Sequence, residues 1–256
     1  MRKQIWKSDA DTDIGGPLRN FPKTHHSAIV AVRSEDPQRR QQAFEAILES
    51  YWKPVYKYVR IKWRVSNEDG KDLTQGFFAN AFEKNHLANY DTGKASFQTF
   101  LRTCVDGYVA NQQKAQQRLK RGGGVDMFSL DFSGAENELT LHPPATELSP
   151  EEYFQQEWTR NLFTLAVEAL RLSYEQSDKA VRFQIFEKYD LDDSPEKISY
   201  NSLADEFRLT ATTVNNHLAA ARRDFRKILI EKLRQLTAND QEFRVAARQL
   251  LGIEVK

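Results

Sequence analysis

The stretch LADEFRLTATTVNNHLAAARRDFRKIL, residues 203–229, decides the interpretation of the chain. In its second half, Val214, Leu218 and Phe225 recur at helical spacing, which predicts a helix with one apolar face packed on a core. Leu203 and Phe207 predict a shorter helix before it, and residues 208–210 leave room only for a tight turn. The stretch therefore predicts two helices joined by a turn.

The polar face of the second predicted helix carries the side chains that proteins use to contact DNA. Hydroxyl and amide groups come first and can reach base edges, while guanidinium groups further along can neutralise phosphates. These residues are Thr212, Thr213, Asn215, Asn216, Arg222 and Arg223. The pattern predicts a helix-turn-helix whose second helix enters the major groove. An ordinary helical hairpin with a solvated polar face is the alternative.

The predicted turn departs from the usual pattern at one position. Arg208 stands where glycine is frequent, and we expect it to adopt a left-handed conformation. A residue other than glycine in that conformation costs about 1 kcal/mol. Thr210 is placed to cap the second helix, which favours the same turn.

The composition is typical of a globular protein that does not enter a membrane. The chain has 256 residues, of which 29% are charged and 40% hydrophobic. No apolar run approaches the length of a membrane span, and residues 1–16 lack the apolar core of a signal peptide, so we expect a cytoplasmic protein. Cys104 is the single cysteine, which excludes an internal disulfide and a multi-cysteine metal site.

A formal net charge of +1 conceals two basic clusters. One runs from Lys114 to Arg121 and the other from Arg222 to Lys227, and each ends a predicted amphipathic helix. Acidic segments elsewhere in the chain balance them. The local charge is therefore compatible with nucleic-acid binding, although the net charge is close to zero.

The periodicity along the chain predicts an all-α fold of two small helical domains joined by a flexible linker, the C-terminal one containing the helix-turn-helix. The predicted parts are an N-terminal extension (residues 1–37), a first domain (38–121), the linker (122–157), a second domain (158–236) and a C-terminal helical tail (237–256). Gly122 to Gly124 end the last helix of the first domain, and small, polar and acidic residues dominate up to Pro150. Pro54 predicts an interruption in the helix over residues 38–63.

The order of these motifs resembles that of a known family. Asp72-Leu73-Thr74-Gln75 leads into Phe77-Phe78, Phe97-x-x-Phe100-Leu101 opens a long basic helix, and a linker and the predicted helix-turn-helix follow. The chain is thus similar to bacterial RNA polymerase sigma factors of the small, two-domain extracytoplasmic-function class. The resemblance covers residues 38–121 and 158–233.

The resemblance implies a function in transcription initiation. A sigma factor of this class binds core RNA polymerase and directs it to promoter DNA, with the first domain melting and reading the minus-ten element. The second domain reads the minus-thirty-five element, which assigns that role to the polar face of residues 212–223. The flipped minus-ten base would be held in the polar loop of residues 86–96, where side chains can hydrogen-bond to it or stack on it.

The resemblance also implies the remaining site residues. For the minus-ten element they are Asn89, Tyr90, Gln113, Lys114, Gln117, Arg118, Lys120 and Arg121, and for the polymerase clamp they are Glu68, Asp72 and Gln75. Asp106 is a departure, because relatives generally carry a basic or neutral residue there. A carboxylate facing phosphate would be repelled, so we do not expect Asp106 to touch DNA.

The predicted clamp-binding helix suggests regulation by phosphorylation. Gly76 stands at a position that is usually acidic in the family, which depletes the attraction to a basic clamp. A phosphate on Thr74 would add a charge of about −1.5 to −2 beside Asp72. Some subgroups of the class are coupled to serine/threonine kinases, and we predict that this chain is one of them, with Thr74 as the modified residue and Ser66 as a second candidate. An anti-sigma protein is the other regulatory partner that stays open.

Two other classes of function compete with a sigma factor. A helix-turn-helix regulator that never binds core polymerase explains the C-terminal half, but it leaves the helix around DLTQGFF without a role. An enzyme is not expected, because the histidines show no paired metal-ligand spacing and Gly93-Lys94 lacks the other residues of a phosphate-binding loop. The sequence thus predicts no catalytic residue, metal or cofactor.

Overall fold

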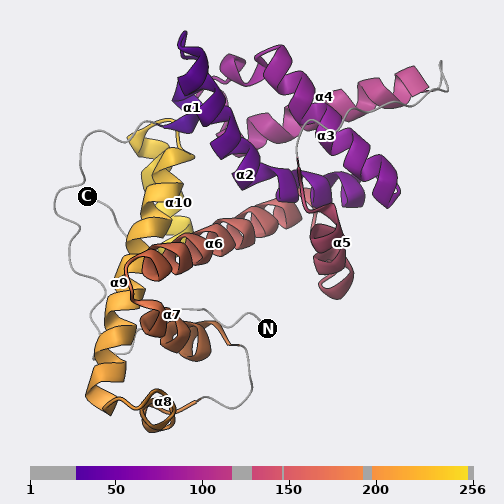
Figure 1. Ribbon diagram of the computed structural model, residues 1–256. Coiled ribbons are helices and arrows are strands. Elements are labelled where there is room, and N and C mark those ends of the chain that lie inside the picture. The colour runs from indigo at the N-terminus through magenta and orange to yellow at the C-terminus, as the bar shows by residue number, and fades with distance from the viewer. Residues whose placement is uncertain (1–26, 117–128, 146, 193–197, 253–256) are drawn as a thin grey trace. The chain divides into compact units, whose positions relative to one another are not determined.

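The computed structural model describes residues 27–116, 129–145, 147–192 and 198–252, and no strand occurs in these residues. The all-α class is thereby confirmed for them. Contacts within the chain divide it into two compact units, whose helices are labelled in Figure 1. The N-terminal unit comprises Thr24–Leu162 and Leu233–Ala246, and the C-terminal unit includes Phe163–Lys232 and Ala247–Lys256.

The N-terminal unit is built around one long helix, α2. Its elements are α1 (Ala28–Ala31), α2 (Pro37–Lys62), α3 (Asn67–Glu83), the 3-10 helix η1 (His86–Asn89), α4 (Phe97–Gln116), α5 (Phe132–Leu141) and the first part of α6 (Pro150–Gln176). Helices α1, α3, α4 and α5 all pack against α2. The fully buried ring of Tyr51 in α2 lies 5.5 Å from that of Phe97 in α4 and 6.1 Å from that of Trp158 in α6.

Local sequence sets where the first helices begin. The carboxylate of Asp36 accepts a hydrogen bond from the backbone N–H of Gln38 at 3.0 Å, and Pro37 occupies the first turn of α2. The hydroxyl of Ser66 likewise accepts from the backbone N–H of Asp69 at 3.1 Å at the start of α3. Both caps satisfy backbone donors that have no partner within the helix.

The predicted interruption at Pro54 does not occur, because α2 runs unbroken through it. Proline lacks the N–H that would bond to the carbonyl of Ser50 one turn earlier. The side-chain amide of Asn161 in α6 supplies this donor, with its nitrogen 3.0 Å from the Ser50 oxygen and 3.2 Å from the oxygen of Glu49. A tertiary contact therefore replaces the hydrogen bond that the sequence removes from the helix.

The stretch expected to be a flexible linker is helical over much of the part that the structure describes. Phe132–Leu141 form α5, with the Asp131 side chain accepting from the N–H of Gly134 at 2.9 Å, and α6 begins already at Pro150. Phe132, Ala135 and Leu139 are buried and give α5 one apolar face. The composition of residues 122–157 hides this face, because it occupies only three positions among polar residues.

A buried ion pair joins α2 to α6 inside the N-terminal unit. The side chain of Lys57 is fully buried, and its Nζ lies 2.6 Å from Glu157 and 2.8 Å from Glu138. Glu157 is also buried and accepts a hydrogen bond from Arg160. A buried charge is tolerated only when it is paired, and the equally buried Glu157 provides that pairing for Lys57.

The C-terminal unit consists of the remainder of α6, α7 (Ala180–Phe186), the π-helix η2 (Glu187–Leu191), α8 (Tyr200–Phe207) and α9 (Ala211–Gln235) as far as Lys232. Its core is aromatic, with the ring of Phe225 lying 5.9 Å from Phe163 and 5.8 Å from Phe186. The hydroxyl of Tyr174 donates to Asp224 at 2.7 Å at the edge of this core.

The predicted C-terminal tail forms α10 (Asp240–Leu251), and its first part belongs to the N-terminal unit. Arg234 pairs with Asp240 at 2.7 Å, and its guanidinium carbon lies 4.0 Å from the ring centroid of Phe243. The turn between α9 and α10 is fixed by these contacts. No helix that the structure describes is both long enough and apolar enough to cross a membrane.

Candidate nucleic-acid interface

The turn between α8 and α9 has the geometry that the sequence predicts for it. Arg208 ends α8 in the left-handed region, with φ 54° and ψ 45°, and the N–H of Leu209 bonds to the carbonyl of Ala204 at 2.8 Å. The hydroxyl of Thr210 accepts from the N–H of Thr213 at 3.1 Å, which caps the start of α9. The expected left-handed arginine and the expected cap are both confirmed.

The first turns of α9 present a polar face. Thr212 and Asn216 are exposed, whereas Thr213 and Asn215 are half-buried and the hydroxyl of Thr213 lies 2.8 Å from that of Thr210. Further along, the side chain of Arg223 is 75% exposed. Amide, hydroxyl and guanidinium groups on one accessible face can donate to and accept from base edges and neutralise phosphates.

Arg222 does not belong to this exposed face, contrary to the sequence prediction. Its side chain is buried, and its guanidinium forms two hydrogen bonds of 2.9 Å with the carboxylate of Asp190 and lies over the ring of Tyr189. Burial alone would lower the pKa of Arg222, but the bonds to Asp190 outweigh it and raise the pKa. The spacing contains a signal for this, because Arg222 stands one turn after the buried Leu218 and next to the buried Ala221.

The loop expected to bind a flipped base places its two candidate residues differently. Asn89 is exposed, but Tyr90 is buried against Phe97 and Phe100, with ring centroids 5.2 Å and 5.4 Å away. The Tyr90 hydroxyl donates to the carbonyl of Ala95 at 3.0 Å. Tyr90 is therefore a core residue in this structure and offers no free face for stacking.

A second set of contacts holds the same loop from outside. The Tyr90 hydroxyl also contacts the carboxylate of Glu242 in α10, and Arg33 donates to the backbone oxygens of Ala88 and Tyr90. Burial raises the pKa of Tyr90, and the neighbouring Glu242 raises it further. The sequence contains no local signal for Glu242, because the two residues lie 152 positions apart.

The basic end of α4 is only partly described. Gln113 is half-buried and Lys114 is exposed on the last described turns of α4. The predictions for Gln117, Arg118, Lys120 and Arg121 lie outside the described residues. The structure therefore places one exposed cation and one amide of this set on the same helix.

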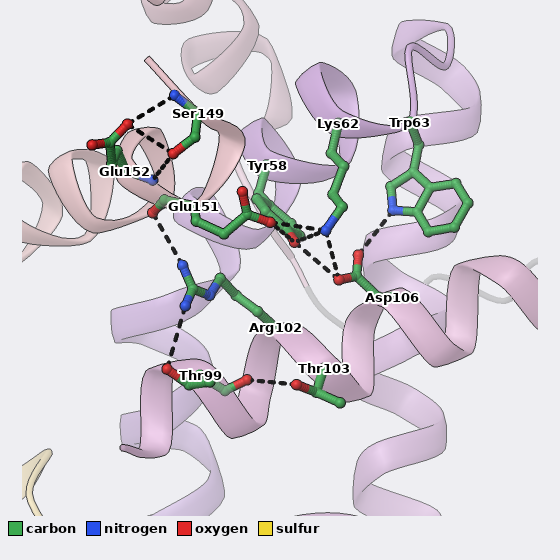
Figure 2. A network of polar contacts seen from close by, with 10 residues as sticks. All are labelled: Tyr58, Lys62, Trp63, Thr99, Arg102, Thr103, Asp106, Ser149, Glu151 and Glu152. Atoms are coloured by element: carbon green, nitrogen blue, oxygen red, sulfur yellow. Dashed lines mark hydrogen bonds and ion pairs between the residues drawn. The ribbon is translucent and has the colours of Figure 1, made fainter. Parts of the chain in front are cut away.

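Asp106 has a structural role within the N-terminal unit. Its carboxylate accepts from two groups of α2, the Tyr58 hydroxyl at 3.0 Å and Lys62 Nζ at 2.9 Å, and from Nε1 of Trp63, the residue after α2, at 3.1 Å (Figure 2). Lys62 also pairs with Glu151 of α6 at 2.9 Å. The carboxylate of Asp106 thus points into the N-terminal unit.

The first turn of α6 completes this network. Arg102 of α4 donates to the backbone oxygen of Glu151 at 3.1 Å, and the hydroxyl of Ser149 accepts from the backbone N–H of Glu152 at 3.2 Å (Figure 2). The hydrogen bond from Lys62 lowers the pKa of Glu151. Helices α2, α4 and α6 are therefore joined at one polar junction within the N-terminal unit.

The predicted polymerase-binding residues lie on α3. Glu68 and Asp72 are exposed, Gln75 is half-buried, and Glu68 pairs with Lys71 at 3.0 Å. The structure explains why position 76 is a glycine, because a Cβ there would lie 2.3 Å from the hydroxyl oxygen of Tyr108 in α4. A larger side chain at this position therefore requires Tyr108 of α4 to shift.

Thr74 is fully buried in the core side of α3, and its hydroxyl donates to the carbonyl of Gly70 at 2.8 Å. A kinase requires an accessible hydroxyl, so phosphorylation of Thr74 requires that α3 first opens locally. Ser66 is exposed, although its hydroxyl caps α3. The structure thus favours Ser66 over Thr74 in accessibility alone.

In the described part of the chain, no three histidine, cysteine or acidic side chains are grouped so that they could hold a metal ion. In comparisons with known proteins, no family model, no curated protein and no solved structure matches the chain.

Proposed function

We propose that the chain is a sigma factor, which binds core RNA polymerase and directs it to specific promoters. The exposed polar start of α9 is the observation that carries the proposal. It follows a capped three-residue turn, Arg208 to Thr210, and brings Thr212, Asn216 and Arg223 onto accessible positions of one helix. A short helix, a tight turn and a longer helix follow one another in the order of a helix-turn-helix, in which the second helix would read the major groove.

The N-terminal unit supports a role beyond DNA binding. Its α3 presents the carboxylates of Glu68 and Asp72 to solvent, as a surface that docks on a basic clamp requires. Lys114 of α4 is exposed as well. A regulator that only binds DNA would have no use for an acidic docking surface, so these features favour the sigma factor.

The decisive experiment is transcription from a genomic promoter library by core polymerase with and without the full chain. We expect new start sites that share a minus-thirty-five sequence. Asn216→Ala should cost about 1 to 3 kcal/mol of binding free energy and relax the preference at one base pair. Arg223→Ala should weaken binding to all sequences and reduce the salt slope by about 1.

Arg244→Ala is the matched control for Arg223→Ala, since Arg244 is an exposed arginine of α10 outside the proposed interface. It should leave transcription unchanged. Sequence-specific DNA binding without retention of core polymerase would favour the helix-turn-helix regulator. Absence of new start sites, even with protein phosphorylated at Ser66 or Thr74, would contradict the sigma factor.

Phosphorylation of α3 stays a prediction, and modification of the buried Thr74 would require the helix to open. If Thr74 is the modified residue, the modified protein should exchange the backbone amides of α3 faster than the unmodified protein, because a phosphate does not fit the buried position. Modification of Ser66 should leave the core of α3 protected. Mapping the phosphate by mass spectrometry together with hydrogen exchange separates the two.

A further inference from the structure

Helix α5 covers a strip of α2 that combines cations with aromatic rings. The strip consists of Trp52, Lys53, Tyr56, Lys57 and Arg60, which we call the α2 strip. Its members recur at helical spacing and so lie along one face of α2. Nothing in the roles proposed above uses this face.

Helix α5 contacts the α2 strip through two carboxylates, beside an apolar cluster in which Phe132 and Ala135 pack on Tyr56. Glu138 places one carboxylate oxygen 2.8 Å from Lys53 Nζ and the other 2.8 Å from Lys57 Nζ. Glu136 pairs with Arg60 at 2.5 Å and accepts a hydrogen bond from the Tyr56 hydroxyl at 2.5 Å. Two carboxylates thus engage the three cations of the strip and the hydroxyl of Tyr56.

The aromatic part of the strip packs against Phe132 and Ala135 of α5 and against Leu130 just before it. Phe132 of α5 meets Trp52 edge-on with ring centroids 5.4 Å apart, and it meets Tyr56 in the same manner at 5.2 Å. Cations that neutralise phosphates and aromatic rings that stack on bases are the combination with which proteins bind single-stranded nucleic acid.

We propose that the α2 strip is a binding site for single-stranded DNA and that α5 occupies it as an intramolecular substitute for the nucleic acid. The three cations are about 6 Å and about 4.5 Å apart along the helix axis, so one strand can pass all of them. The site is separate from α9 and from the minus-ten residues on α4. It does not require that the chain binds polymerase.

Helix α5 has the properties of a displaceable element. It has 10 residues, and a helix of that length is marginal on its own in water. Its apolar face consists of three buried side chains, Phe132, Ala135 and Leu139. Glu138 remains 39% exposed and Glu136 22% exposed, so salt screens their ion pairs in part.

The α2 strip survives the departure of α5. Lys57 keeps its ion pair with Glu157 of α6, and Tyr56 keeps its hydrogen bond to Asn67 at 2.8 Å. The opposite side of α2 remains packed through Tyr51 on Phe97 and Trp158. Opening therefore frees Lys53, Arg60 and the two rings without unfolding the helix that carries them.

The test compares three full-length variants in their binding to a fluorescent oligothymidine of about 12 nucleotides, a typical site length. E136Q/E138Q removes the two carboxylate charges of α5. E49Q/E83Q is its matched control, because it removes two exposed carboxylates of the same unit outside the α2 strip. The third variant adds K53Q and R60Q to E136Q/E138Q.

We expect E136Q/E138Q to bind the oligonucleotide at least about tenfold more tightly than the control, with a log–log salt slope of about −1.4 for the two phosphate contacts of Lys53 and Arg60. The added K53Q and R60Q should cancel the gain and bring the slope of this site to about zero. Hydrogen exchange should show faster exchange in residues 132–141 of E136Q/E138Q, while α2 stays protected.

Two results would overturn the proposal. One is equal oligonucleotide binding by E136Q/E138Q and by E49Q/E83Q, provided that hydrogen exchange shows α5 released. The other is binding of a peptide with the sequence of residues 129–143, but of no oligonucleotide, by the released protein, which would make the α2 strip a docking surface for acidic helices. If α5 of E136Q/E138Q stays protected from hydrogen exchange, residues 130–142 are replaced by a glycine-serine segment, which exposes the α2 strip. Oligonucleotide binding by that protein no tighter than binding by E49Q/E83Q then overturns the proposal.

Discussion

Tyr90 and Glu242 are joined by a hydrogen bond across 152 positions of the sequence, from the phenol of the loop after η1 to a carboxylate in the first turn of α10. The other oxygen of Glu242 accepts from the backbone N–H of Ala238 at 2.8 Å, so the carboxylate is held from two sides. The first part of α10 is therefore held in the N-terminal unit and restrains the loop predicted to bind the minus-ten base.

This contact predicts a coupling between two distant replacements. Tyr90→Phe and Glu242→Gln should each lower the free energy of unfolding by about 1 kcal/mol, since each removes one of the hydrogen bonds described above. The double variant should cost less than the sum of the two, which urea unfolding measures as a coupling energy. Strict additivity would mean that the hydrogen bond contributes nothing to the loop.

The replacement of a backbone donor by Asn161 predicts a second coupling. Asn161→Ala should cost about 1 to 3 kcal/mol, because it leaves the buried carbonyl of Ser50 without a partner. In a Pro54→Ala background the backbone N–H of residue 54 can serve that carbonyl, so the same replacement should cost about 1 kcal/mol less. Asn137→Ala, at an exposed position of α5, is the control and should not depend on residue 54.

The close approach of Tyr108 to Gly76 predicts a change of sign. Gly76→Ala should destabilise the protein by about 1 to 3 kcal/mol through overpacking against the phenol oxygen 2.3 Å from the new Cβ. Tyr108→Phe removes that oxygen and leaves the ring carbon 3.4 Å away, an ordinary contact. In that background Gly76→Ala should instead stabilise α3 by about 1 kcal/mol. Thermal unfolding measures the effect of Gly76→Ala on stability in each background. An equal effect in both backgrounds would exclude the steric explanation.

The docking of α5 should depend on pH. The hydrogen bond from Arg60 holds the pKa of Glu136 below its ordinary value. Burial alone would raise the pKa of Glu138, but the hydrogen bonds from Lys53 and Lys57 outweigh burial, so the pKa of Glu138 is lowered as well. Groups with a depressed pKa stabilise the fold above the ordinary glutamate pKa of about 4.3, and the contribution is lost as the pH falls below it.

We therefore expect E136Q/E138Q to be less stable than the unchanged protein by about 1 kcal/mol at neutral pH. The difference should shrink as the pH falls below about 4, where the carboxylates of the unchanged protein become protonated as well. Urea unfolding at several pH values measures it, with E49Q/E83Q as the control for charge. A difference that stays constant down to acid pH would show that the ion pairs do not hold α5.

The sequence predicted those features of the fold that depend on neighbours along the chain. The all-α class, the turn at Arg208 and the cap at Thr210 follow from periodicity and from local hydrogen bonding, and the structure has all three. Local reasoning was insufficient at Pro54 and at Arg222, because the groups that decide their conformations, Asn161 and Asp190, come from other helices.

The candidate site was predictable to a similar extent. Exposure of Thr212, Asn216 and Arg223 follows from the helical period, which also identifies the buried face beside them. Tyr90 could not be recognised as buried from its polar neighbours in the loop, because the rings that cover it and Glu242 come from α4 and α10.

The pairing of Lys57 with Glu157 also constrains how the chain folds as it is synthesised. The two residues are 100 positions apart, and at about 5 to 20 residues per second the ribosome needs about 5 to 20 seconds to pass from one to the other. During this time α2 lacks the carboxylate and the aromatic face of α6, and its apolar side stays open to water. The N-terminal unit is closed only after Leu233–Ala246 has been made. An N-terminal fragment that ends before α6 should therefore aggregate rather than fold as a domain of its own.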